Sequence, residues 1–140
     1  MNYEQICQYV FEKELIDWTF KDSKKRDRNL VETRQICIYI GNWFIPVLTW
    51  SALALPFGKD HSTAMHAVKH IRELMYSDKV FGEKVLEYMK YVREQNKIDA
   101  EEQAKKLYED RDKIEKLYDL IDKMELVAKV YCDITNKKMI

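Results

Sequence analysis

The chain has 140 residues with 24 basic and 24 acidic side chains, and this zero formal charge excludes a uniformly basic nucleic-acid binder but not a local basic patch. Three glycines and two prolines interrupt a sequence that is 46% hydrophobic, which favours an all-helical chain. The absence of a long apolar run and of paired cysteine spacing among Cys7, Cys37 and Cys132 predicts a cytoplasmic protein with reduced thiols and no membrane contact.

The first predicted helix begins at Asn2, because Gln5 stands three residues later and can complete a capping box. Ile6 and Val10 give this helix an apolar stripe. Residues 21–34 then carry six basic and three acidic side chains. A run of this kind is most often a solvated surface loop, so its charge alone is weak evidence for a binding site.

A second capping box, formed by Asn29 and Glu32, predicts a buried helix that runs to about Pro46. Its expected apolar positions are Leu30, Ile36, Ile40 and Trp43. Thr49 is the expected cap of a short helix over residues 50–55. One long and one short predicted helix thus precede Gly58 and the segment that follows it.

After Gly58, Asp60 is the expected cap of a helix that runs to about Tyr76. One face of this helix is apolar and rich in small residues, namely Ala64, Ala67, Val68, Ile71 and Met75. The opposite face is polar, with Ser62, His66, Lys69 and Glu73. A short helix, a tight turn and a helix with small inner residues are typical of a helix-turn-helix, in which the polar first turn faces the edges of bases.

Three segments in this order resemble the C-terminal DNA-binding domain, domain IV, of the bacterial replication initiator DnaA. They are ICQYVFEKELIDWTFKDSKKR (6–26), SKKRDRNLVETRQICIYI (23–40) and FGKDHSTAMHAVKHI (57–71). The third is similar to the family signature Phe-Gly-(x)-Arg-Asp-His-Ser/Thr-Thr-Val-x-His-Ala-x-x-x-Ile. The resemblance covers about half of the chain, and it implies a helix-turn-helix of the Trp-repressor type that binds duplex DNA sequence-specifically.

The resemblance also implies which residues touch DNA. In the major groove it implies base contacts from Asp60, His61, Ser62 and Thr63, and in the minor groove from Arg26. The implied backbone contacts are Lys24, Lys25, Arg28, Arg34, Gln35, Lys59, His66 and Lys69. Hydroxyls and imidazoles can bond base edges, and an arginine in a narrow minor groove reads A·T-rich shape.

Simpler interpretations of these residues remain open. Asp60 could act only as a helix cap, His61 could be an ordinary exposed histidine, and Arg26 could be a solvated loop charge. His66 and His70 lie one helical turn apart, but spacing places no third ligand, so neither a metal nor a cofactor is expected. The sequence shows no catalytic pair and no Gly-x-x-x-x-Gly-Lys-Ser/Thr phosphate loop, so we expect no enzyme and no small-molecule substrate.

Residues 77–140 lie outside the resemblance and predict an extension of two helices. Ser77 would cap the first, EQNKID (94–99) would break the chain, and Asp99 with Glu102 would start a long helix reaching about Asn136. The long helix carries an apolar stripe in near-heptad spacing: Leu107, Ile114, Leu117, Ile121, Met124, Ala128 and Tyr131. We expect a homodimer through this stripe, with the alternative that the helix folds back onto its own domain.

The patterns predict an all-α protein with a helical extension over residues 77–140, and the resemblance implies a DnaA domain IV-like DNA-binding domain over residues 1–76. The expected function is sequence-specific binding of double-stranded DNA in replication initiation or transcription regulation. The alternative is a helical protein–protein interaction module whose DNA-binding surface has decayed.

Overall fold

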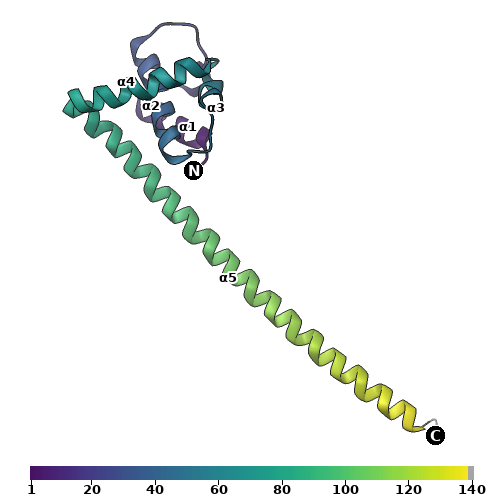
Figure 1. The fold of residues 1–140 in the computed structure, drawn as a ribbon. Helices are drawn as coiled ribbons and strands as arrows, with labels where there is room; N and C mark the ends of the chain where they lie inside the picture. The colour runs from purple at the N-terminus through teal and green to yellow at the C-terminus, as the bar shows by residue number, and fades with distance from the viewer. Residues whose placement is uncertain (139–140) are drawn as a thin grey trace. The chain divides into compact units, whose positions relative to one another are not determined.

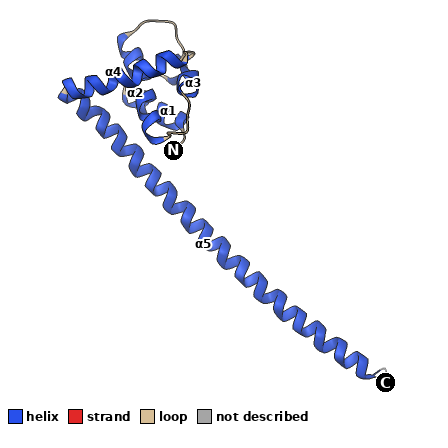
Figure 2. Cartoon of the chain, viewed as in Figure 1, coloured by secondary structure: helices blue, strands red, loops and turns tan. Residues whose placement is uncertain are grey.

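The computed structural model describes the backbone of residues 1–138 and the surroundings of the side chains of residues 1–134. Within this part of the chain every regular element is helical, which confirms the all-α class (Figures 1 and 2). The α-helices are α1 (Tyr3–Lys13), α2 (Arg28–Phe44), α3 (Trp50–Ala54), α4 (His61–Ser77) and α5 (Lys79–Lys138), with 3-10 turns η1 (Trp18–Phe20) and η2 (Leu55–Phe57). The chain divides into two compact units, the first Met1–Lys97 and the second beginning at Ile98.

The first unit is built around α2, which packs against both α1 and α4, while α3 packs against α4. Its core is closed by aromatic side chains from three separate elements. The Phe11 ring meets Trp18 edge to face at 5.0 Å and stacks on Phe57 at 6.1 Å between centroids. Such contacts between elements stabilise short helices that would be marginal alone.

The segment from α3 to α4 forms the helix-turn-helix. Gly58 has φ 64°, a left-handed conformation that favours glycine, and it ends η2 before the chain reverses into α4. Ala54 on α3 and Ala64 and Ala67 on α4 are buried, and the two helices pack against each other. Small side chains allow helices to approach closely. The predicted inner face of α4 is confirmed at Ala64, Ala67, Val68 and Ile71, whereas Met75 is only partly buried.

Of the six predicted helix starts, three are confirmed and three are wrong, the last of them at Asp99 inside α5. Asn2 forms its capping box with Gln5, and Thr49 and Asp60 cap α3 and α4. The start predicted at Asn29 is wrong, since α2 begins at Arg28, where the side chain of Asp27 accepts from the Asn29 amide at 3.0 Å. The Ser77 cap is also wrong, because the neighbouring Asp78 carboxylate accepts from the Phe81 amide at 3.2 Å.

The inward position expected for Trp43 is wrong. The indole is 60% exposed, and the buried positions near the end of α2 are occupied by Ile40 and Gly41. Helical spacing alone could not separate these neighbours, because several residues in this region are apolar and only one stripe of the helix can face the core.

The predicted extension of two helices is wrong, because α5 runs from Lys79 to Lys138 without the expected break at 94–99. The EQNKID segment contains neither glycine nor proline, and its polar residues lower helix propensity by only a few tenths of a kcal/mol each. A possible capping box at Asp99 therefore does not start a new helix.

The first unit also extends further than the predicted boundary after Tyr76, because it ends at Lys97. The start of α5 contributes the buried side chains Phe81, Val85, Tyr88, Met89 and Val92 to its core. On the rim of this contact Tyr88 donates to Glu14 Oε1 at 2.9 Å, and Lys84 Nζ lies 2.9 Å from the same oxygen. The beginning of α5 is thus an integral core helix.

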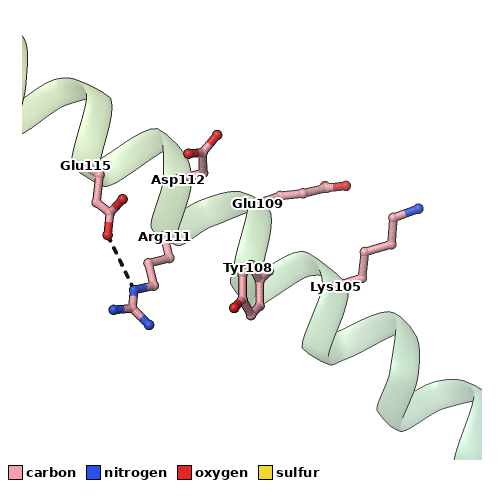
Figure 3. A pocket seen from close by; sticks show the side chains of 6 residues that line it. All are labelled: Lys105, Tyr108, Glu109, Arg111, Asp112 and Glu115. Atoms are coloured by element: carbon pink, nitrogen blue, oxygen red, sulfur yellow. Dashed lines mark ion pairs between the residues drawn. The ribbon is translucent and has the colours of Figure 1, made fainter.

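In the second unit every described side chain, over residues 98–134, is exposed. Ion pairs one helical turn apart join Arg111 to Glu115 at 3.6 Å and Lys116 to Asp112 at 3.3 Å. Figure 3 shows the Arg111–Glu115 pair among the side chains that flank a shallow hollow, all of which come from successive turns of this one helix.

None of the described helices is long and apolar enough to cross a membrane.

Candidate nucleic-acid interface

The N-terminal turn of α4 carries the residues predicted to contact bases. Asp60 caps the helix, and its carboxylate accepts from the Thr63 amide at 3.0 Å and from the Thr63 hydroxyl at 3.1 Å. The backbone hydrogen bond, followed by the hydroxyl, lowers the pKa of Asp60 below its ordinary value. Asp60 therefore stays ionised at neutral pH and fixes the direction of the Thr63 hydroxyl.

The same turn presents its other polar groups outward. His61 and Thr63 are exposed and Ser62 is partly buried, whereas Ala64 lies in the core. The exposed face continues along α4 through His66, Lys69 and His70. The amphipathic pattern of α4 thus leaves one polar face available to a ligand over several turns.

The basic segment forms a loop between η1 and α2. Its cationic side chains Lys24, Lys25 and Arg26 are exposed, as is Arg28 at the start of α2. None of these four cations forms an ion pair with another described side chain. Their positive electrostatic potential is therefore available to attract a ligand.

A hollow of about 490 Å³ lies between this loop and the helix-turn-helix. Lys24, Lys25 and Arg26 line it from the loop, while Lys59 and Thr63 line it from the turn and α4. Its apolar lining is Val31, Ile38 and Phe57. The structure therefore brings together, on one face, the loop and the turn that the sequence analysis assigned to two different grooves of DNA.

Arg34 differs from its sequence expectation, in which it contacts a phosphate. The side chain is only 6% exposed, and its guanidinium donates into the basic loop. Nε donates to the carbonyl oxygen of Lys21 at 2.7 Å, and Nη2 donates to those of Ser23 at 2.6 Å and Phe20 at 3.4 Å. Burial lowers the pKa of Arg34, and the nearby Asp22 carboxylate opposes this shift.

The remaining predicted contact residues fall into two groups. Gln35 is partly buried and lines both the 490 Å³ hollow and a second one of about 370 Å³, which Arg28 and His70 also line. Asp60, His61, Ser62, His66 and Lys69 line neither of these two hollows and belong to the surface of α4.

Sequence reasoning considered His70 only as a metal ligand. It is exposed on α4, four residues after His66, and this helical spacing was the available signal that both belong to one face. Among the described residues no group of three or more His, Cys, Asp or Glu side chains could hold a metal ion. Instead, His70 and Arg28 line the same 370 Å³ hollow, at the polar face of α4.

Comparison with known proteins relates this arrangement to replication initiators. The family model described as the bacterial dnaA protein helix-turn-helix matches residues 3–71, from α1 into α4. The chain is 36% identical over 88 residues to the chromosomal replication initiator protein DnaA of Campylobacter concisus, covering 62% of this chain and 20% of that protein. The corresponding values are 38% over 81 residues, 57% and 17% for the protein of the same name from Campylobacter fetus subsp. fetus, and 32% over 91 residues, 64% and 19% for that from Rickettsia bellii. The chain thus spans about one fifth of the length of these curated relatives.

Proposed function

Because residues 3–71 match the family model of the bacterial DnaA helix-turn-helix, we propose that this chain binds duplex DNA sequence-specifically and acts in replication initiation. The observation that carries the proposal is the shared face on which the exposed basic loop adjoins the turn before α4. One rigid protein surface can then engage adjacent major and minor grooves.

In this proposal the first turn of α4 enters the major groove. Asp60 holds Thr63 in a fixed orientation, and His61, Ser62 and Thr63 offer short directional groups to base edges. The buried alanines behind this turn support it against α3, so the reading groups need little reorganisation on binding.

The basic loop supplies the second part of the contact. Arg26 enters the minor groove, where an arginine is attracted by the negative potential of a narrow A·T-rich segment. Lys24, Lys25, Arg28 and Lys59 are exposed and pair with phosphates. The same role falls to Gln35, His66 and Lys69, which set the position of the protein on the duplex.

Binding to a duplex selected from a random pool, measured by fluorescence anisotropy at several salt concentrations, tests this function. If about five phosphates are neutralised, the affinity falls with a log–log slope of about −4 to −5. A flat response would contradict DNA binding and favour the alternative, a helical interaction module with a decayed DNA surface.

His61→Ala tests sequence reading in the same assay. We expect a loss of about 1–3 kcal/mol on the selected sequence and a weaker preference over unrelated sequences, because a base contact carries the discrimination. The matched control is Lys69→Ala on the same helix, which should weaken binding to all sequences alike and reduce the salt slope by about one. Equal losses across sequences for His61→Ala would make it a backbone contact.

The matched family is a helix-turn-helix, and we propose that the chain contributes DNA binding without catalysing a reaction. The relatives named above are replication initiators, which favours replication over transcription regulation as the process.

We also propose that the chain forms a homodimer through the second unit. Leu107, Ile114, Leu117, Ile121 and Met124 recur at heptad spacing, and all five are about half exposed or more. Leaving each of them in water forgoes roughly 1.5–3 kcal/mol of burial. A second copy is the occupant that fits, because an identical stripe has the same length and spacing and a two-fold dimer uses one surface twice.

Light scattering after size exclusion tests the dimer. We expect the mass of two chains for the wild type at micromolar concentration and of one chain for Ile121→Lys, which places a charge in the stripe. The control Asp122→Lys adds the same side chain at the next, polar position and should remain dimeric. A monomeric wild type would contradict the proposal.

A further inference from the structure

The basic loop has few backbone hydrogen bonds of its own. The Ser23 amide donates to the Phe20 carbonyl at 3.0 Å, and the Lys25 amide donates to the Ser23 hydroxyl at 3.3 Å. Successive cationic side chains from Lys24 to Arg26 repel one another, and a free loop of this length loses substantial conformational entropy when it is ordered. An additional interaction must therefore hold the loop in place.

Arg34 supplies that interaction from the buried face of α2. Its three hydrogen bonds reach the carbonyls of Phe20, Lys21 and Ser23, which span the end of η1 and the start of the loop. A guanidinium presents several donors in a planar fork, so it can reach separate carbonyls at once. A lysine at this position would carry the same charge but only one nitrogen.

The position of Arg34 also relates the loop to the helix-turn-helix. Its side chain lines the same hollow as Arg26, Lys59 and Thr63. Asp22, at the start of the basic loop, lies close to the turn before α4. A Cβ added to Gly58 in that turn would lie 4.0 Å from Cβ of Asp22. Fixing the loop carbonyls thus fixes the distance between the proposed minor-groove and major-groove readers.

We propose that Arg34 is a positioning residue that holds the basic loop beside the turn, so that Arg26 reaches the minor groove while α4 reads the major groove. This inference rests on the proposed DNA-binding function. Arg34 acts through Arg26, because its guanidinium donates hydrogen bonds to loop carbonyls of the protein and not to a phosphate. The A·T preference of the site consequently depends on a residue that does not touch DNA.

Hydrogen exchange of the free protein tests the bracing without DNA. In Arg34→Lys and Arg34→Ala we expect faster exchange of the Ser23 and Lys25 amides, with unchanged exchange in α1. The lysine variant keeps the buried charge and thereby controls for loss of charge. Unchanged loop exchange in both variants would overturn the proposal.

A double-mutant cycle with Arg26→Ala tests the consequence for binding. On a site flanked by A·T-rich DNA, each of Arg34→Lys, Arg34→Ala and Arg26→Ala should lose about tenfold in affinity, the size of one specific contact. The double variants should lose little more than about tenfold in affinity, because Arg34 is proposed to act only by positioning Arg26, so the two effects do not add. On a G·C-flanked site the losses should shrink together.

Two outcomes would overturn the role of Arg34 in DNA reading. If Arg34→Lys retains wild-type affinity, or if its effect adds to that of Arg26→Ala, then Arg34 acts as an independent charge. Arg28→Ala is the matched control, since an exposed phosphate contact should add to Arg26→Ala and reduce the salt slope. A wild type that fails to bind DNA would refute the proposed function, while the exchange experiment would still judge the bracing.

Discussion

The Asp60 carboxylate has a structural task, and the proposed function gives it a second one. It caps α4 through the Thr63 amide and orients the Thr63 hydroxyl, which belongs to the proposed base-reading turn. The capping task is visible in the sequence, because aspartate before an amphipathic run is a strong N-cap signal. The second task needs the three-dimensional direction of the hydroxyl, which no spacing rule supplies.

The ionisation of Asp60 leads to a prediction about acid stability. Hydrogen bonds from Thr63 lower the pKa of Asp60 in the folded state, so its stabilising effect is complete above its ordinary pKa near 3.8 and is lost as the pH falls through the folded value. Asp60→Asn keeps a capping oxygen without the charge. The wild type should therefore exceed the variant in Tm at pH 7, and thermal denaturation should show the difference shrinking as the pH falls below 3.8.

The matched control for this prediction is Asp17→Asn. Asp17 also caps a turn through a backbone amide and has a lowered pKa, but it caps η1 and not α4. Its variant should show a similar dependence of Tm on pH without a change in DNA affinity at pH 7. A Tm difference for Asp60→Asn that persists unchanged at pH 2 would contradict the linkage.

Arg34 marks the limit of sequence reasoning at the scale of single residues. Its place in the basic segment and its match to the family predicted a surface contact, yet its side chain is buried and bound to loop carbonyls. Helical periodicity describes which face of α2 a residue occupies, but it cannot say that a polar loop folds over that face. The exposed cations Lys24, Lys25 and Arg26 were by contrast predictable, because charged loop residues default to solvent.

At the scale of elements, local signals predicted α1, α3 and α4 better than α5. Those three helices carry explicit caps at Asn2, Thr49 and Asp60, and α4 ends close to its predicted limit. In α5 a cap-like pair at Asp99 and Glu102 lies inside a continuous helix. A capping pair starts a helix only where the preceding chain departs from helical geometry, and nothing in EQNKID forces that departure.

The position of the unit boundary gives a prediction for truncated chains. A chain ending at Lys97 should unfold with nearly the Tm of the same unit in the 140-residue chain, because it retains the whole core of the first unit. A chain ending at Tyr76 loses buried side chains including Val85 and Val92. At roughly 1.5–3 kcal/mol each, this loss approaches the entire stability of a domain.

Circular dichroism during heating, with the two truncated chains compared at equal concentration, measures this difference. We expect a cooperative transition for residues 1–97 and a greatly lowered or absent one for residues 1–76. Equal Tm values would show that the start of α5 is dispensable and would restore the boundary predicted from sequence.

At the scale of the whole molecule, the proposed functions assign DNA recognition to the first unit and association to the second. The first unit holds the residues proposed to read DNA, and the second holds the exposed heptad stripe. Family resemblance ends before the second unit, so its role was inferred from periodicity alone. Heptad spacing indicates that a partner helix is required but does not specify which chain provides it.

This division predicts avidity for DNA that carries two recognition sites. A dimer that holds two first units converts the second binding event into an intramolecular one, so a two-site duplex should bind up to about 100-fold more tightly than a one-site duplex. Titrations should include several spacings between the sites, since the gain disappears when both cannot be engaged together. Ile121→Lys should retain the one-site affinity of the wild type and lose the two-site gain, whereas Asp122→Lys should keep both. A two-site gain that survives in Ile121→Lys would mean that cooperativity arises between first units on DNA, independently of the stripe in α5.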